Sequence, residues 1–72
     1  MRIRYFPETD TLYVELTDQL VVETREIAED ALVDLDAAGN LVALTVEHAR
    51  ERANMADFSF QQIMTQTYVA VQ

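Results

Sequence analysis

The chain has 72 residues, half of them apolar, and thirteen Asp and Glu against five Arg, which gives a formal net charge of −8. This length allows one small domain that buries only roughly 60% of the surface of its unfolded chain, so a partner chain is expected to help complete the core. The acidic balance argues against direct binding to nucleic acid or membrane surfaces, and the absence of cysteine excludes disulfides, thiolate metal sites and thiol nucleophiles.

The first residues do not resemble a targeting signal. Arg2 and Arg4 stand where a signal peptide needs its apolar stretch, and no apolar run in the chain approaches the roughly 18 residues of a membrane span. We therefore expect a cytoplasmic protein.

Residues 2–6 and 11–16 alternate between apolar and polar side chains, which is the pattern of β-strands. Pro7 has no amide proton for a ladder and begins a turn-forming stretch, so the two strands are predicted to form a hairpin. Alternation places the aliphatic side chains of the second strand on one side, which we expect to face the core. These side chains are Leu12, Val14 and Leu16.

Residues 20–27 show weaker alternation and carry Glu23, Arg25 and Glu26. Charged side chains on an edge strand discourage pairing with other chains. This segment is therefore predicted to be an edge strand.

A second hairpin is predicted from strands 31–36 and 41–46, joined around Gly39. Gly39 is the only glycine, and a short hairpin loop needs the positive φ that glycine tolerates. The returning strand is apolar on both sides, which indicates a central strand or one covered on its second face.

After Val46 the pattern changes, because residues 47–55 are rich in helix formers and predict a short helix. Arg50 and Arg52 stand beside glutamates there, which is typical of a solvated helix face. Asp57 is predicted to cap a second helix over residues 58–66. Residues 68–72 either extend that helix or add a strand.

The C-terminal segment differs in composition from the rest of the chain, since the only charged side chain beyond Arg52 is Asp57. Its large apolar side chains are expected to cover a sheet face, either that of the same chain or that of a neighbour, because burying each is worth roughly 1.5–3 kcal/mol. We predict an oligomer interface made of Phe58, Phe60, Ile63, Met64, Tyr68, Val69 and Val71.

Asp34, Asp36 and Gly39 are spaced as in the opening of a calcium loop. An EF-hand also needs a side-chain ligand at its fifth position and a glutamate at its twelfth, and these positions hold Ala38 and Thr45. The hairpin-turn interpretation is therefore favoured, and no metal site is predicted.

His48 is the only histidine, and histidine is the side chain that titrates near neutral pH without perturbation. A catalytic base or a metal ligand needs partners at matching spacing, so a solvated or capping histidine is the favoured interpretation. A solvated sheet edge or a partner-facing patch likewise accounts for the acidic cluster of Glu23, Glu26, Glu29 and Asp30. We predict no catalytic residue and no cofactor.

The stretch from Tyr5 to Leu16, with Pro7, Glu8, Asp10, Leu12 and Tyr13, resembles the opening of the domain of unknown function 2283 family of small bacterial and archaeal proteins. The resemblance continues through residues 26–30, 33–36, 39 and 41–47 and covers about the first fifty residues. It implies a compact β-meander with a following helix and no established biochemical activity. Some members are neighbours of small toxin-like proteins, which implies an antitoxin-like role. The family supplies no functional residue to carry over, and Ala43 stands where it often has glycine.

We therefore predict a single α+β domain over residues 1–72, with an antiparallel β-meander of about five strands in residues 1–46 and one or two short helices in the apolar segment 47–72. The predicted function is a non-enzymatic binding or assembly module that forms a homo-oligomer, a dimer or larger. An antitoxin-like protein that neutralises a small basic protein is the first alternative. A small-ligand-binding protein or enzyme that uses His48 is the second.

Overall fold

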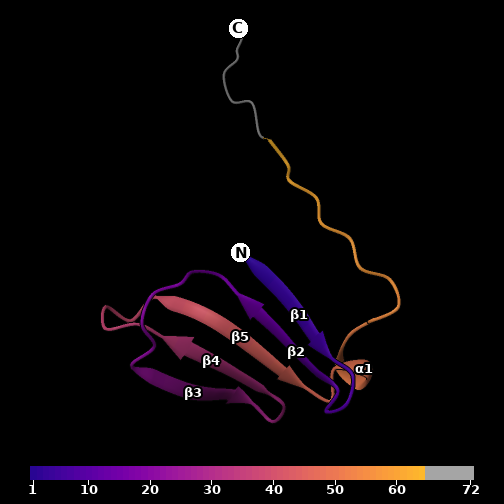
Figure 1. The fold of residues 1–72 in the computed structure, drawn as a ribbon, viewed down its shortest axis with the longest axis horizontal. Coiled ribbons are helices and arrows are strands. Elements are labelled where there is room, and N and C mark those ends of the chain that lie inside the picture. The colour runs from indigo at the N-terminus through magenta and orange to yellow at the C-terminus, as the bar shows by residue number, and fades with distance from the viewer. Residues whose placement is uncertain (65–72) are drawn as a thin grey trace, which may run out of the picture.

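Each of the alternating stretches in the first 47 residues forms a strand in the computed structural model, which describes residues 1–64 (Figure 1). One five-stranded antiparallel sheet results, with one short helix at its end, which confirms the predicted antiparallel sheet. The elements are β1 (Arg2–Phe6), β2 (Thr11–Glu15), β3 (Glu23–Ala28), β4 (Ala31–Leu35), β5 (Leu41–Glu47) and α1 (Ala49–Arg52).

The strands lie in the order β1-β2-β5-β4-β3. Hairpin connections join β1 to β2, β3 to β4 and β4 to β5, as the predicted meander requires. The strand β5 also pairs with β2, so β2 and β3 are not neighbours in the sheet. The order confirms that residues 41–47 form the central strand and that β3 lies at an edge.

The connection from β2 to β3 crosses the end of the sheet and shortens the predicted strand 20–27, which begins only at Glu23. The backbone N–H groups of Leu16 and Thr17 donate to the carbonyl oxygen of Val42 at 2.8 and 3.2 Å. The N–H of Val22 donates to the carbonyl oxygen of Leu35 at 2.9 Å. Residues 20–22 are needed to reach the far edge of the sheet, so they belong to the connection.

The register aligns aliphatic residues in a row across the sheet. Ile3 lies opposite Val14, Val14 opposite Leu44, and Leu44 opposite Val33. A second row brings Leu12 beside Val46. Because side chains alternate between faces along a strand, one side of the sheet is apolar. We call the part of this side formed by Ile3, Leu12, Val14, Val33, Leu44 and Val46 the aliphatic face; alternation places Tyr5, Leu35 and Val42 on the same side.

The interior of this single sheet is small. Within residues 1–64 the buried hydrophobic side chains are those of Leu35, Val42, Ala43 and Ala49, and no large side chain is fully buried. Ile3 is 42% exposed, whereas the other members of the aliphatic face are half-buried. Neighbours on the same face shield them sideways, but a second layer is needed to bury them completely.

The helical predictions are confirmed only for one short piece. His48 adopts the left-handed region, with φ 54° and ψ 46°, and α1 ends at Ala53, whose backbone is extended. The predicted second helix is wrong for residues 58–64, which form no regular secondary structure, and its last two residues lie outside the described range. A helix this short is not stable without packing of its apolar side, and the large apolar residues here are 67–75% exposed.

Within residues 1–64, no helix has both the length and the apolar character needed to cross a bilayer.

Candidate interaction surface

The aliphatic face occupies the middle of the sheet and is uncharged there. Along β2, β5 and β4, alternation and register place only aliphatic side chains on this side. Among the strand residues, charged side chains lie on this side only on the edge strand β3, where Arg25 Nε lies 2.7 Å from Glu23 Oε2. This pairing lowers the pKa of the Glu23 carboxyl group. At the border near α1, the Arg50 guanidinium lies over the ring of Tyr5. An apolar surface bordered by a neutralised pair is suited to contact with another apolar surface.

The opposite, more polar face of the sheet carries Tyr13 and Leu32 among polar groups that bind one another. Glu15 Oε1 lies 3.2 Å from Arg2 Nε and 3.7 Å from Arg4 Nη2, so the carboxylate of β2 pairs with two arginines of β1. On β3 and β4, Thr24 donates a hydrogen bond of 2.7 Å to Asp34 Oδ1. These charged and polar groups are therefore paired within the chain.

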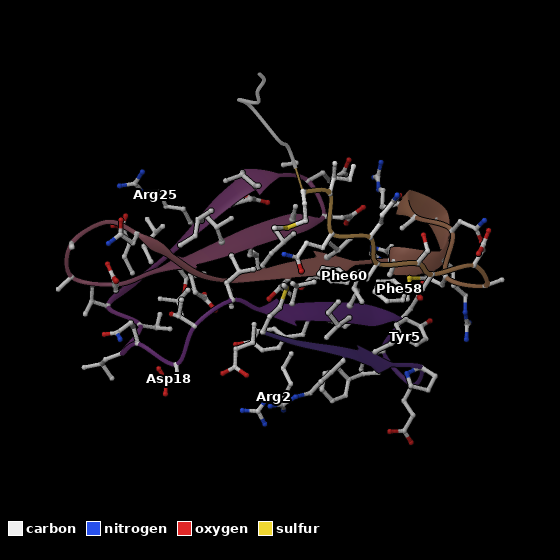
Figure 2. The ribbon with its side chains drawn as sticks, turned by 90° about the horizontal axis from the view of Figure 1, so that it is seen from above. Arg2, Tyr5, Asp18, Arg25, Phe58 and Phe60 are labelled. Atoms are coloured by element: carbon white, nitrogen blue, oxygen red, sulfur yellow. The ribbon has the colours of Figure 1, made fainter. Side chains whose placement is uncertain are left out.

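The described members of the predicted oligomer interface, Phe58, Phe60, Ile63 and Met64, lie in a segment that leaves α1 on the β1 side of the view (Figure 1). Phe58 and Phe60 nevertheless reach the border of the aliphatic face, where they line a hollow of about 290 Å³ together with Met1 and Ile3. Both aromatic side chains are mostly exposed, at 67% and 69%, and Figure 2 shows them above the sheet.

The other members of the predicted interface are not brought into this hollow. Ile63 and Met64 are 75% and 70% exposed. Tyr68, Val69 and Val71 lie outside the described residues. The structure thus joins the first part of the predicted interface to one border of the sheet.

A polar cluster lies at the end of the sheet where β5 runs into α1. Strands β2 and β4 flank β5 and run antiparallel to it, so the residues just before them, Asp10 and Asp30, lie beside the residues that follow β5. The carbonyl oxygen of Asp30 accepts the Glu47 N–H at 2.7 Å, and that of Asp10 accepts the Ala49 N–H at 2.9 Å. Backbone hydrogen bonds thus hold the junction from both sides.

The carboxylate of Asp10 caps α1 although it lies far away in sequence. It accepts the Arg50 N–H at 3.1 Å through Oδ1 and at 3.3 Å through Oδ2, and it accepts the Tyr5 hydroxyl at 2.5 Å. The hydrogen bond to Asp10 raises the pKa of Tyr5. The Arg50 guanidinium lies 5.9 Å from the centroid of the Tyr5 ring, within the range of a cation–π contact. Asp10 therefore ties β1 and β2 to α1.

The carboxylate of Asp30 lies between the imidazole of His48 and the guanidinium of Arg52. Its Oδ1 is 3.0 Å from His48 Nδ1, and its Oδ2 accepts Arg52 Nε at 2.8 Å and lies 2.6 Å from Arg52 Nη2. The hydrogen bonds from His48 and Arg52 lower the pKa of Asp30, and the hydrogen bond to Asp30 raises the pKa of His48. His48 is thus paired, and its visible role is to fix the β5–α1 junction.

This cluster corrects the sequence interpretation of its members. Arg50 and Arg52 bind Asp10 and Asp30 rather than forming only a solvated helix face, and Asp30 is a partner of the junction rather than a free edge charge. The signal in the sequence is the position of each aspartate directly before a strand. That signal is usable only when β2 is known to lie beside β5.

The candidate calcium loop is a hairpin turn, as favoured above. Asp36 Oδ1 accepts the N–H groups of Ala38 and Asn40, each at 2.9 Å, and Gly39 has a φ of 84°. The carboxylate is therefore used within the turn. Among residues 1–64 the structure shows no group of three or more His, Asp or Glu side chains that could hold a metal ion.

Comparison with known proteins gives one finding about the family. The model of the family described as "Protein of unknown function (DUF2283)" matches residues 2–50. No curated protein and no solved structure matches the chain. The matched range contains the five strands, Asp10, Asp30 and His48, whereas Phe58 and Phe60 lie beyond it.

Proposed function

The chain belongs to the DUF2283 family of proteins of unknown function, and we propose that it is a homo-oligomerising binding and assembly module rather than an enzyme. The observation that carries the proposal is the aliphatic face, which has no second layer over it within residues 1–64. Complete burial of a large aliphatic side chain stabilises by roughly 1.5–3 kcal/mol relative to exposure. The sheet has only three buried hydrophobic residues within residues 1–64, so much of that stabilisation is left to a partner.

The C-terminal segment supports association with further copies of the same chain. Phe58, Phe60, Ile63 and Met64 are all at least 67% exposed, and Asp57 is the only charged residue beyond Arg52. The net charge of −8 opposes association through the rest of the surface, but that repulsion is weakest where the chain is neutral. Self-association is therefore favoured through the apolar surfaces.

Sedimentation velocity across low and high micromolar concentrations tests this proposal, with Phe60→Asp and its neighbour Gln61→Asp as a matched pair. Both variants add one negative charge to an exposed position, but only the first removes a large apolar side chain. We expect Phe60→Asp to weaken association by at least about tenfold, equivalent to about 1.4 kcal/mol, and Gln61→Asp to change it much less. A natural chain that remains monomeric at high micromolar concentration overturns the proposal.

Binding to a basic protein, as in an antitoxin-like role, is the second candidate function. Exposed carboxylates favour it, since the side chains of Glu29 and Glu23 are 88% and 48% exposed and the chain carries a net charge of −8. Attraction between exposed charges is screened beyond about 10 Å at 0.1 M salt, so such binding weakens as salt is added. Co-purification with the product of an adjacent gene at low and high salt tests this role. Binding that does not respond to salt counts against it.

A further inference from the structure

We propose that two copies pack with their aliphatic faces against each other around a two-fold axis and so form a two-layered sandwich. This inference rests on the proposed homo-oligomerisation and names the surface and arrangement that it uses. Two sheets that pack face to face lie about 10 Å apart, with interdigitating side chains and strand directions within about 30° of each other. In that arrangement the six members of the aliphatic face become a core shared by both copies.

The chemistry of the aliphatic face selects a second copy as its occupant. The face offers no carboxylate on β2, β5 or β4, so a basic partner has no counter-charge there. An uncharged apolar surface is the complement that such a face requires. The chain itself supplies that surface, because a two-fold axis places the same patch on both sides of the contact.

The C-terminal segment of the same copy does not take this place within the described residues. It reaches the sheet only at the β1 border, where Phe58 and Phe60 leave the hollow beside Ile3 unfilled. Its four large apolar side chains stay 67–75% exposed, and Leu44 and Val33 in the middle of the sheet stay half-buried. The middle of β5 and β4 therefore remains available to the second copy, whereas Val42 and Leu35 at the end of these strands are already buried.

The area of the face indicates that the border residues take part as well. Five strands about 4.8 Å apart and five to seven residues long present roughly 400 Å² on one side, or roughly 800 Å² for a pair of copies. Stable interfaces bury about 1,200–2,000 Å² in total. Phe58 and Phe60 from both copies can supply the difference, because an aromatic side chain buries about 150–250 Å². The sandwich thus accounts for two otherwise separate features, the open face and the exposed aromatic residues.

Single-cysteine variants test this arrangement, because the natural chain has no cysteine that reacts in their place. Leu44→Cys and Thr45→Cys are neighbours on β5, both half-buried within one copy, and they lie on opposite faces. The rate of labelling by a maleimide is measured at concentrations below and above association. We expect labelling of Leu44→Cys to slow by about tenfold when nine-tenths of the copies are associated, and that of Thr45→Cys to stay constant.

The outcomes separate this inference from the proposed function. If Leu44→Cys labels at a constant rate while sedimentation shows an oligomer, the sandwich is overturned and homo-oligomerisation stands. Protection of Thr45→Cys instead assigns the contact to the polar face and also overturns the sandwich. If the chain sediments as a monomer, both proposals fail. Should circular dichroism show that Leu44→Cys is unfolded, Val33→Cys and Leu32→Cys repeat the comparison on β4.

Discussion

Replacing Asp10 with alanine removes several contacts at once from the end of the sheet where β1, β2 and α1 meet. The variant loses the acceptor of the Tyr5 hydroxyl at 2.5 Å and the cap of the Arg50 N–H at 3.1 and 3.3 Å. It also places alanine at a φ of 55°, in the left-handed region that aspartate tolerates better. The hydrogen bond from the Ala49 N–H to the carbonyl oxygen of residue 10 is kept.

The expected loss in the free energy of unfolding follows from these contacts. Removal of the helix cap costs about 1 kcal/mol. Loss of the hydrogen bond from the Tyr5 hydroxyl to the carboxylate costs about 1.5 kcal/mol, the low end of the range for charged partners. Placing alanine in the left-handed backbone conformation costs about 1 kcal/mol more. The Arg50 ion pair at 3.9 Å adds little, because its guanidinium is 64% exposed. We expect Asp10→Ala to cost about 3.5 kcal/mol. Asp10→Asn keeps an acceptor and tolerates the backbone, so we expect about 1 kcal/mol.

Urea unfolding followed by circular dichroism measures these losses, at a fixed protomer concentration because association shifts apparent stability. Glu8→Ala in the same turn is the control, since this exposed residue should change the free energy by no more than about 0.5 kcal/mol. Tyr5→Phe should cost about 1 kcal/mol in the natural chain and nothing in Asp10→Ala. The reasoning is refuted if Asp10→Ala costs no more than Glu8→Ala.

Three further predictions concern the turns and the ion pairs. Gly39→Ala should lower the free energy of unfolding in urea by about 1 kcal/mol, because φ is 84° there although no atom lies within 4 Å of the added Cβ. Hydrogen bonding to Asp30 raises the pKa of His48, so the stabilisation by protonated His48 is complete below its ordinary pKa of 6.5 and is lost as the pH rises through the raised value. The melting temperature should therefore fall as the pH rises over that range. His48→Gln should remove this part of the pH dependence. An equal fall in the variant would show that His48 is not the group responsible. Arg2→Ala should lower the free energy of unfolding in urea by under about 1 kcal/mol, because the Arg2 side chain that pairs with Glu15 is 66% exposed. The loss should be smaller at high salt, which screens the pair.

The strands could be predicted because their signals are local. Period-two alternation over residues 2–6, 11–16 and 41–46 identifies both the strand and the face of each side chain. Gly39 likewise indicates a turn through its own backbone preference. These features depend on neighbours in sequence, so a single sequence is sufficient to find them.

The pairing of β2 with β5 and the polar cluster were not predictable in the same way. Nothing in residues 11–16 alone shows that they pair with residues 41–47, since sequential pairing with the next strand satisfies the same alternation. The contacts of Asp10 with α1 and of Asp30 with Arg52 follow from that strand order. The prediction of a second helix was wrong because helix propensity over a few residues does not replace tertiary packing.

The candidate surface was found only in part. Composition points to Phe58 and Phe60, which the structure places at the border of the sheet. Alternation predicts that the aliphatic side chains of the second strand share one side of the sheet. It does not predict whether another layer of the protein covers that side. Only the arrangement in space shows that the members of the aliphatic face remain half-buried.

The central position of β5 also determines the order in which the sheet can form. Until residues 41–47 are added, the β1–β2 and β3–β4 ribbons have no common neighbour, and β2 and β4 each present an unpaired edge. Two-stranded ribbons are marginal in water, and unpaired edges favour wrong association during folding. The last of the strands in residues 1–64 thus joins both ribbons, so refolding should proceed as one cooperative step, without a stable intermediate built from the first forty residues.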